Sequence, residues 1–202
     1  MTENTNLIRF LDIGIAIITI LMALPFFIIV VIAMFFFQGL PIIYSQNRSG
    51  KDFQPFRIYK LRTMKLATED ELGLTKGLHD ERITKLGFFL RKYKIDEIPQ
   101  LINVLKNEMS IVGSRPQVPF YTQKFNNYYA QILLQKPGLL SQSAIEFSNE
   151  DEILDQVDNP VAHYEEVLIP IKCKMDIALV NNFNVKTYFL TIFDYCKKIF
   201  LK

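Results

Sequence analysis

A long apolar segment near the N-terminus limits what this chain can fold into. From Ile13 to Phe37 the sequence carries no charged residue. As a straight helix rising about 1.5 Å per residue, the segment would reach about 37 Å, enough to cross the hydrocarbon core of a bilayer. Pro25 lies in its middle, where a proline removes one backbone donor and clashes with the preceding turn. The segment therefore predicts either a kinked membrane span or a helix, break and helix that enters and leaves by the same face.

The rest of the chain is long enough for one compact domain. The sequence has 202 residues, and a membrane segment of about 30 would leave a length typical of single domains. The apolar segment is too long for the core of a cleavable signal, and no small-x-small cleavage pattern follows it, so we expect it in the mature protein. Gly39 and Pro41 are expected to end its helix. We divide the chain into an anchor, residues 1–41, and a domain over residues 42–202.

Charge is distributed unevenly along the chain. A net charge of +2 is too small to imply a nucleic-acid partner. Basic residues gather directly after the apolar segment, and the positive-inside tendency places such a stretch in the cytoplasm. The stretch would suit anionic lipid head groups or a phosphorylated substrate, and an ordinary solvated basic surface is the alternative. Among its residues are Arg48, Lys51, Arg57, Lys60, Arg62, Lys65, Arg82, Lys85, Arg91, Lys92, Lys94 and Lys106.

Short strands and helices are predicted after the anchor. Residues 42–44 and 56–61 have the composition of strands, and residues 47–52 between them are rich in turn formers. Residues 83–93 carry apolar side chains at helical spacing. The C-terminal run 185–202 mixes aromatic and aliphatic residues with lysines, which suits an amphipathic helix in the membrane interface; a core-packing helix is the alternative.

Other segments and residue types add less. The charged stretch from Lys65 to Asp80 contains two glycines and has the composition of a mobile loop, which would suit a lid. The two cysteines and two histidines are too isolated to indicate a disulfide or a metal cluster.

The adjacent pair Asp96 and Glu97 is the strongest candidate for chemistry. We expect Asp96 to cap a helix whose first turn holds Pro99. A helix N-terminus stabilises an ionised carboxylate, and the basic residues 91–94 would lower its pKa further. Such a carboxylate can attack phosphorus or carbon, and attack on a pyrophosphate needs its charge neutralised by Mg²⁺ or arginines. On this spacing alone, a capped helix with solvent-facing acids is the alternative.

A set of motifs in a fixed order gives a much more specific signal. The motifs are Arg9–Asp12 before the apolar segment, Tyr44–Gly50, Phe56–Met64, Asp80–Gly87, Leu90–Lys92, Ile95–Lys106 and Met109–Pro116. Together with the central proline of the apolar segment, they resemble the bacterial sugar transferases. These are small monotopic phosphoglycosyl transferases that start glycan assembly on polyprenol phosphate.

The resemblance implies a two-step reaction at Asp96. In this family the aspartate of the Asp-Glu pair attacks the β-phosphate of a UDP-sugar and releases UMP, leaving the sugar phosphate on the carboxylate. Undecaprenyl phosphate then attacks this intermediate and becomes a diphosphate-linked sugar, in the first membrane step of glycan assembly. The family requires Mg²⁺, which the resemblance assigns to Asp96 and Glu97, with Glu97 as a metal ligand or base.

Four cations are candidates for binding the phosphates. Arg91 matches the arginine that precedes the catalytic pair in the family. Lys60, Arg62 and Arg115 are further candidates, because cationic side chains, and guanidinium forks in particular, suit phosphate geometry. Each of the four, taken alone, is equally well explained as a surface cation.

The resemblance also implies a fold and a location. It implies an α/β-leaning, mostly helical fold, with the N-terminal helix broken near Pro25 and re-entering the membrane. Residues 1–12 and the catalytic domain would then share the cytoplasmic face of the bacterial inner membrane. We expect a UDP-sugar, undecaprenyl phosphate and the membrane as partners and no nucleic acid, with a homodimer left open.

The chain departs from the family pattern in its C-terminal third. Many members have proline where Ser114 stands here, and a Gly-Ile-Thr-Gly run where residues 138–141 stand. Sugar and nucleotide contacts therefore do not transfer there. We expect Glu146 and residues 150–152 to face solvent, and contacts with sugar hydroxyls are the alternative. Two other functions stay open. One is a glycosyltransferase that releases UDP, which would want an Asp-x-Asp motif that the sequence lacks. The other is a catalytically silent membrane adaptor.

Overall fold

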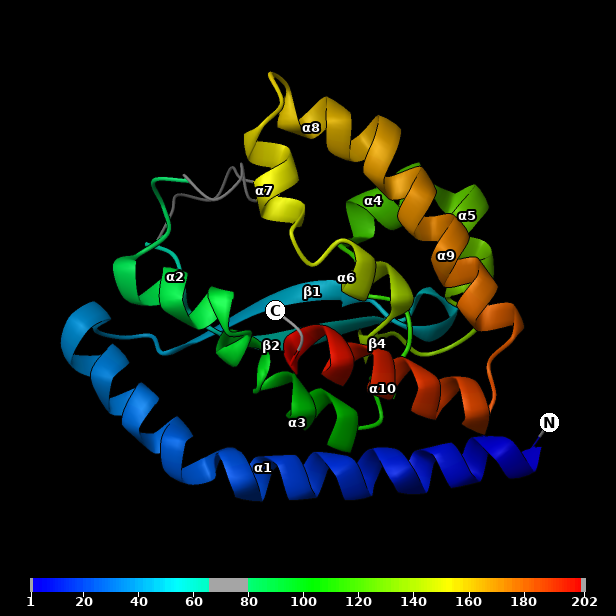
Figure 1. Ribbon diagram of the computed structural model, residues 1–202, viewed down its shortest axis with the longest axis horizontal. Helices are drawn as coiled ribbons and strands as arrows, with labels where there is room; N and C mark the ends of the chain where they lie inside the picture. Colours follow the sequence, from blue (N-terminus) through cyan, green and yellow to red (C-terminus); the bar gives the residue numbers. More distant parts are fainter. Residues whose placement is uncertain (1, 66–79, 201–202) are drawn as a thin grey trace.

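The computed structural model describes residues 2–65 and 80–200. This part of the chain is mostly helical with a few short strands, as the sequence predicts (Figure 1). The segment predicted as a lid, residues 65–80, lies outside the described residues except at its two ends. The strands are β1 (Ile43–Ser49), β2 (Pro55–Leu61), β3 (Ser110–Val112) and β4 (Gly138–Leu140). The helices are α1 (Thr2–Gln38), α2 (Lys85–Lys92), α3 (Gln100–Leu105), α4 (Pro119–Lys124), α5 (Asn126–Ile132), α6 (Gln142–Glu146), α7 (Glu150–Asp155), α8 (Pro160–His163), α9 (Ile169–Asn181) and α10 (Val185–Phe200). Three tighter or wider turns are η1 (Lys51–Phe53), η2 (Ile95–Glu97) and η3 (Tyr164–Leu168).

Helix α1 is one continuous helix that contains Pro25. The predicted break is therefore not a gap between two helices. Helix α1 bends along its length and remains helical throughout (Figure 1). It ends at Gln38, and Gly39 follows with a φ of +68°, a conformation that glycine adopts at little cost. The expected helix stop is confirmed.

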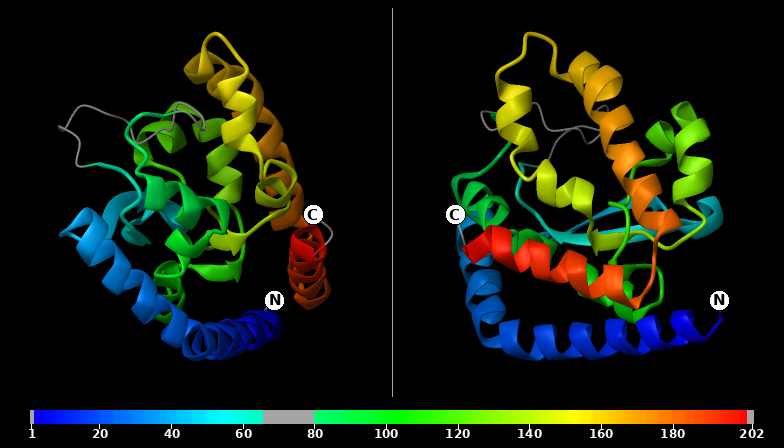
Figure 2. Two further views of the ribbon diagram at one scale, coloured as in Figure 1. Left: turned by 60° about the vertical axis from the view of Figure 1, so that its left-hand side comes forward. Right: turned by 45° about the vertical axis from the view of Figure 1, so that its right-hand side comes forward.

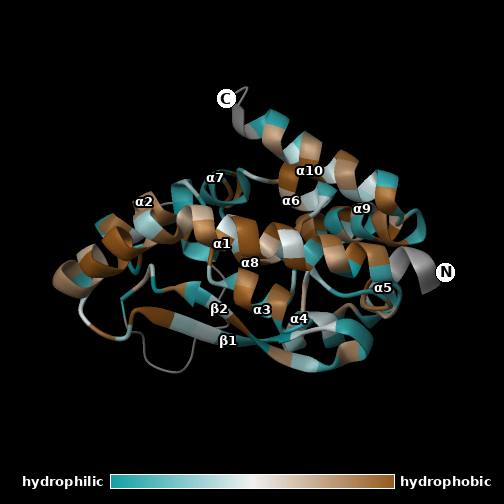
Figure 3. Ribbon diagram, turned by 90° about the horizontal axis from the view of Figure 1, so that it is seen from below, coloured by the Kyte–Doolittle hydropathy of each residue, from teal (hydrophilic) through white to brown (hydrophobic). Residues whose placement is uncertain are grey.

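Most of the apolar surface of α1 is uncovered. Of the described helices, α1 is the one long and apolar enough to cross a membrane, and only 11% of its most apolar stretch is buried. Met22, Phe36 and Phe37 are each more than three-quarters exposed. Figure 3 shows hydrophobic residues along much of this helix. An exposed apolar surface of this size marks a site of association with a membrane or another protein, and the length and hydropathy of α1 suit a membrane.

The first half of α1 is attached to the rest of the molecule by buried polar contacts. One carboxylate oxygen of Asp12 accepts hydrogen bonds from the Ser110 hydroxyl at 3.0 Å, the Ile111 N–H at 2.9 Å and the Tyr188 hydroxyl at 2.9 Å. Arg9 donates to the carbonyl of Val104 at 2.6 Å. These contacts join α1 to β3, α10 and the end of α3.

Strands β1 and β2 form an antiparallel hairpin, paired from Ile43 with Leu61 to Ser49 with Pro55. The turn-rich run was expected to begin at residue 47, but residues 47–49 belong to β1, because they pair with residues 55–57. The turn itself is closed by the Gly50 N–H donating to the Gln54 carbonyl at 2.8 Å. The hairpin is therefore longer than predicted, and it carries the cationic side chains of Arg48 and Lys60.

The helix predicted at the C-terminus is confirmed as α10. It has one buried face and one exposed face. Tyr188 and Thr191 are buried, whereas Phe189, Leu190 and Phe193 are about half exposed or more. One face therefore packs on the core and the other presents apolar residues outward. Helices α7 to α9 lie on the opposite side of the molecule from α1 (Figure 2).

A buried polar network joins α6 to α9. Asp176 of α9 accepts a hydrogen bond from the Ser143 hydroxyl at 2.6 Å, and the Ser143 and Ser141 hydroxyls lie 2.9 Å apart. Burial raises the pKa of Asp176 to about 6, although the bond from Ser143 lowers it. The carboxyl group is therefore more readily protonated in the folded chain than in the unfolded one.

Replacing Asp12 with alanine is expected to destabilise the protein by about 3 kcal/mol, because three donors lose their buried acceptor. Thermal unfolding in detergent measures the change. Asp158→Ala, at an exposed position, is the control and should leave the transition nearly unchanged. Equal melting temperatures for the two variants would contradict the anchoring role of Asp12.

The pKa of Asp176 predicts a pH dependence of stability. The unfolded chain has an aspartate pKa near 4, so the stability from Asp176 is fully present below about pH 4 and is lost as the pH rises through about 6. The loss amounts to about 3 kcal/mol. The side-chain amide of the Asp176→Asn variant cannot ionise, so wild type should become progressively less stable than this variant between about pH 4.5 and 7.5. If the melting temperatures of the two proteins change with pH in the same way over this range, the raised pKa of Asp176 is disproved.

Candidate active site

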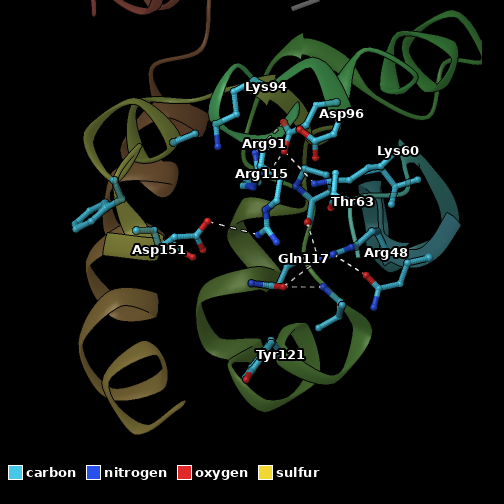
Figure 4. A pocket seen from close by; sticks show the side chains of 18 of the residues that line it. Arg48, Lys60, Thr63, Arg91, Lys94, Asp96, Arg115, Gln117, Tyr121 and Asp151 are labelled. Carbon is cyan, nitrogen blue, oxygen red and sulfur yellow. Dashed lines mark hydrogen bonds and ion pairs between the residues drawn. The ribbon is translucent and has the colours of Figure 1, made fainter. Parts of the chain in front are cut away.

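A cavity of about 480 Å³ lies between the β1–β2 hairpin, η2 and helices α7 and α9 (Figure 4). Among the described residues, nine cationic and five acidic side chains line it. Four predicted site residues, Lys60, Arg91, Asp96 and Arg115, are labelled in Figure 4, and Glu97 also lines the cavity. The structure therefore brings together residues that the sequence separates by up to 55 positions.

Asp96 does not cap the following helix, contrary to the prediction. Helix α3 begins at Gln100 with Pro99 as its N-cap residue, and Asp96 lies in the 3₁₀ turn η2. Pro99 has no N–H, so it cannot donate to the carbonyl of Ile95 and extend α3 backward. The chain enters η2 through Lys94, whose φ of +56° turns the backbone sharply after α2. This turn directs Asp96 into the cavity.

The carboxyl group of Asp96 is buried and incompletely bonded. The residue is 6% exposed, and among the described residues its Oδ1 has no hydrogen-bond partner. Burial raises the pKa of Asp96, and the charge of Lys60 only partly offsets this effect. The low pKa expected from the sequence is therefore wrong in sign, because the loss of water outweighs the nearby cations. One oxygen remains free to react or to bind a ligand.

Glu97 lies between two cations. Its Oε1 is 2.9 Å from Lys60 Nζ and also accepts from Arg115 Nη2, and its Oε2 accepts from Arg115 Nη1 at 3.3 Å. Burial raises the pKa of Glu97, but the charges of Arg115 and Lys60 together lower it well below its usual range. Glu97 is therefore ionised and holds Lys60 and Arg115 beside Asp96.

The two other predicted phosphate partners differ in their surroundings. Arg91 Nη2 lies 3.5 Å from Asp151 Oδ2, across the cavity on α7. Arg62 donates to the carbonyls of Gly39 and Leu40 at 3.0 Å, and also to that of Gln38, so its guanidinium caps the end of α1. A guanidinium so occupied is a poor phosphate partner, and Arg91, Lys60 and Arg115 remain the better candidates.

Acidic residues that were expected to face solvent line the cavity. Glu150 pairs with Lys172 of α9, and Asp151 lies beside Arg91. The expectation fails for these two residues because α7 brings them beside Arg91 of α2 and Lys172 of α9, contacts between distant segments that local charge does not reveal.

Arg48 also lines the cavity and had no assigned role, although it belongs to the Tyr44–Gly50 motif. It donates to Gln46 Oε1 at 2.7 Å and to the Pro116 carbonyl and Gln117 Oε1 at 3.3 Å each. Burial and the neighbouring Arg115 lower its pKa to about 10, so it stays charged at neutral pH. The sequence signal that could have identified Arg48 as a site residue was its position in one of the motifs that resemble the family.

Within the described residues, no group of three or more histidine, cysteine or acidic side chains forms a metal site. Two adjacent carboxylates, Asp96 and Glu97, are among the oxygen donors of the cationic cavity, and Asp96 Oδ1 has no hydrogen-bond partner among the described residues. Mg²⁺ in phosphate-transfer sites is commonly held by one or two carboxylates together with substrate phosphates. The donor set fits that pattern.

Proteins similar to this chain occur in several bacteria. A protein of Bacillus subtilis (strain 168), provisionally named an undecaprenyl-phosphate N-acetylgalactosaminyl 1-phosphate transferase, is 43% identical over 119 residues, covering 59% of this chain and 66% of its own. The UDP-glucose:undecaprenyl-phosphate glucose-1-phosphate transferase of Escherichia coli (strain K12) is 30% identical over 94% of this chain and 40% of its own. A galactosyl transferase of Streptococcus agalactiae is 35% identical over 88% of this chain and 38% of its own.

This chain thus spans less than two-thirds of the length of these relatives. The family model described as bacterial sugar transferase, in contrast, matches residues 3–202, nearly the whole chain. It also covers η2, the β1–β2 hairpin and α7, which build the cavity. The chain belongs to the bacterial sugar transferase family.

Proposed function

We propose that this protein is an enzyme that transfers a sugar 1-phosphate from a UDP-sugar to undecaprenyl phosphate and releases UMP. The observation that carries the proposal is the buried Asp96 carboxyl group: among the described residues its Oδ1 has no hydrogen-bond partner, and nine cations line the cavity around it. A cavity of this charge suits a ligand that carries several phosphate groups. Two relatives are named for the transfer of a sugar phosphate to undecaprenyl phosphate, which supports the acceptor.

The first step is attack by Asp96 on the donor. A carboxylate oxygen forms a bond to the β-phosphorus, and the bond between that phosphorus and the bridging oxygen breaks. The electron pair leaves with the bridging oxygen, so UMP departs as a phosphate that has gained one negative charge. The sugar phosphate stays on Asp96 as an acyl phosphate. Its burial makes the ionised Asp96 carboxylate poorly solvated, which favours attack.

The second step returns the enzyme to its starting state. A phosphate oxygen of undecaprenyl phosphate attacks the same phosphorus, and the carboxylate of Asp96 leaves. A phosphate ion is already an adequate nucleophile, so no base is needed to remove a proton. The product is a sugar joined to undecaprenol through a diphosphate.

We assign Glu97 a positioning role. Both of its oxygens face cations, and its depressed pKa makes it a weak proton acceptor at neutral pH. It holds Lys60 and Arg115 where the donor's phosphates would lie, and these cations offset the charge that develops during transfer. Mg²⁺ would be held by Asp96 and Glu97 together with substrate phosphates, and when bound it supplies further positive charge.

We further propose that α1 is a re-entrant anchor and that the remaining chain lies on the cytoplasmic face of the bacterial inner membrane. The bend in α1 and its exposed apolar surface support this arrangement. Ile95, the neighbour of Asp96, packs in one hydrophobic cluster with Val30 and Met34 of α1. A lipid-linked acceptor held beside α1 would therefore reach the nucleophile without leaving the membrane surface.

Replacing Asp96 with asparagine is expected to lower UMP release by about 10³-fold or more, because the amide cannot form the acyl phosphate. The assay supplies Mg²⁺, undecaprenyl phosphate, and UDP-glucose, UDP-galactose or UDP-N-acetylgalactosamine, and identifies the nucleotide by chromatography. Asp158→Asn, at an exposed position outside the cavity, is the matched control and should keep full activity.

The identity of the nucleotide separates the mechanisms. UMP that depends on Asp96 supports the proposal, and omission of Mg²⁺ should stop its release. UDP would instead show direct glycosyl transfer and exclude a phosphosugar intermediate. Mass spectrometry of wild type incubated with donor alone should show the sugar phosphate attached to the peptide that contains Asp96.

Glu97→Gln is expected to lower turnover by about 100-fold, because the neutral amide no longer holds Lys60 and Arg115 through charge. The exposed Glu81→Gln is its control. The acyl phosphate should still form in Glu97→Gln when incubation is prolonged. Turnover equal to wild type would exclude the positioning role.

A further inference from the structure

One part of the cavity extends past the catalytic pair and is not used by the chemistry described above. We call it the distal lobe, and it is lined by Arg48, Gln117, Tyr121 and Tyr164. In Figure 4, Tyr121 and Asp96 lie at opposite ends of the view, with Arg48 and Gln117 between them. The lobe is therefore placed to hold the part of a ligand that lies away from the reacting phosphorus.

A continuous series of contacts connects the lobe. Arg48 Nη1 donates to Gln117 Oε1 at 3.3 Å, and Gln117 Nε2 donates to the Tyr164 hydroxyl at 2.7 Å. The rings of Tyr121 and Tyr164 meet edge to face with centroids 5.5 Å apart. The lobe thus begins with a cation, continues with an amide and ends with two aromatic rings.

Two buried polar groups in the lobe lack a partner among the described residues. They are the hydroxyl of Tyr121, a residue only 1% exposed, and the Nε of Arg48. No carboxylate in the described part of the chain lies within ion-pair distance of Arg48 either. Buried groups of this kind are unfavourable unless a ligand or an ordered water bonds them.

We propose that the distal lobe binds the UMP half of the donor, with Arg48 on the α-phosphate and Gln117, Tyr121 and Tyr164 around the uracil. Uracil offers two carbonyl acceptors and one N–H donor. The Tyr121 hydroxyl and the Gln117 amide can supply complementary groups, and the tyrosine rings provide an apolar wall. This assignment rests on the proposed function, since it names the part of the site that holds the leaving group.

The placement gives Arg48 a role in the first step. When Asp96 attacks the β-phosphorus, the bridging oxygen takes the electron pair and the α-phosphate becomes more negative. Arg48 would meet that added charge, because no carboxylate in the described part of the chain neutralises its guanidinium. Lys60 and Arg115, held by Glu97, would serve the β-phosphate.

Two ligands that differ only in the base test the proposal, namely UMP and ribose 5-phosphate. Calorimetric titration of detergent-solubilised Tyr121→Phe should show UMP binding about fivefold weaker than in wild type, the effect of one lost hydrogen bond. Binding of ribose 5-phosphate should not change. Arg48→Lys should weaken both ligands by about tenfold, because both carry the phosphate.

Tyr128→Phe is the matched control, since Tyr128 lies on α5 next to the hydrophobic cluster that contains Tyr121 and Tyr164 but does not line the cavity. The free Tyr121→Phe protein should unfold at or above the wild-type temperature, because its hydroxyl bonds nothing in the described part of the chain that folding would lose. A drop in UMP affinity without a drop in stability therefore reports the ligand contact. Unchanged UMP binding in Tyr121→Phe would overturn the uracil assignment.

A second measurement uses the wild-type chain. Photocrosslinking with 5-iodouridine 5′-monophosphate should label the peptides that contain Tyr121 or Tyr164, and labelling confined to α7 or α2 would overturn the proposal. The two failures are distinguishable. If UMP release depends on Asp96 but the lobe variants bind UMP normally, only the lobe assignment fails. If wild type releases UDP or no nucleotide, the proposed function fails.

Discussion

The ion-pair network around Glu97 determines the shape of the active site. Glu97 comes from the short turn η2, Lys60 from strand β2 and Arg115 from the loop after β3, and their charged groups meet at one carboxylate. Removing one member of such a partly buried set leaves charges without partners, which costs more than a surface pair is worth. The three segments therefore hold a common geometry around Asp96, whose Oδ1 has no bonding partner among the described residues. The stability of the network comes from Glu97, and Asp96 is left free to react.

A second set of polar contacts fixes the membrane helix relative to this network. Arg9 and Asp12 attach the start of α1 to β3, α3 and α10, and Arg62 caps the carbonyl groups at its other end. Free carbonyls at a helix C-terminus favour a cation, so Arg62 satisfies groups that Gly39 and Pro41 leave open. Because α1 is held at both ends, its contacts with the rest of the protein would fix the height of the cavity above a membrane that receives α1. A fixed height would suit the proposed acceptor, whose phosphate is tied to a lipid.

Local sequence signals predicted the parts of the structure that depend on local contacts. The apolar run predicted α1 and its stop at Gly39, the periodicity of residues 83–93 predicted α2, and the motifs indicated Asp96, Glu97 and their cations. Predictions failed where distant segments meet. The pKa of Asp96 depends on burial by the whole fold, and the positions of Glu150 and Asp151 depend on how α7 lies beside α2 and α9. The cap formed by Arg62 likewise requires the end of α1 to lie beside β2, which no spacing in the sequence indicates.

The charges of the cavity explain why its two ends are built differently. Near Asp96, three cations are paired with acids: Glu97 holds Lys60 and Arg115, and Asp151 lies beside Arg91. These cations are fixed in place but partly neutralised, which would suit the phosphate that the proposed reaction binds and then transfers. Among the described residues, Arg48 is held by neutral oxygen atoms of Gln46, Pro116 and Gln117, so its charge is fully available. A full charge is best placed where a leaving phosphate gains one, because its attraction then increases as the bond breaks. In the proposed mechanism, the difference between cations paired with acids and the unpaired Arg48 would give the site a direction, from Asp96 as nucleophile toward a leaving phosphate at Arg48.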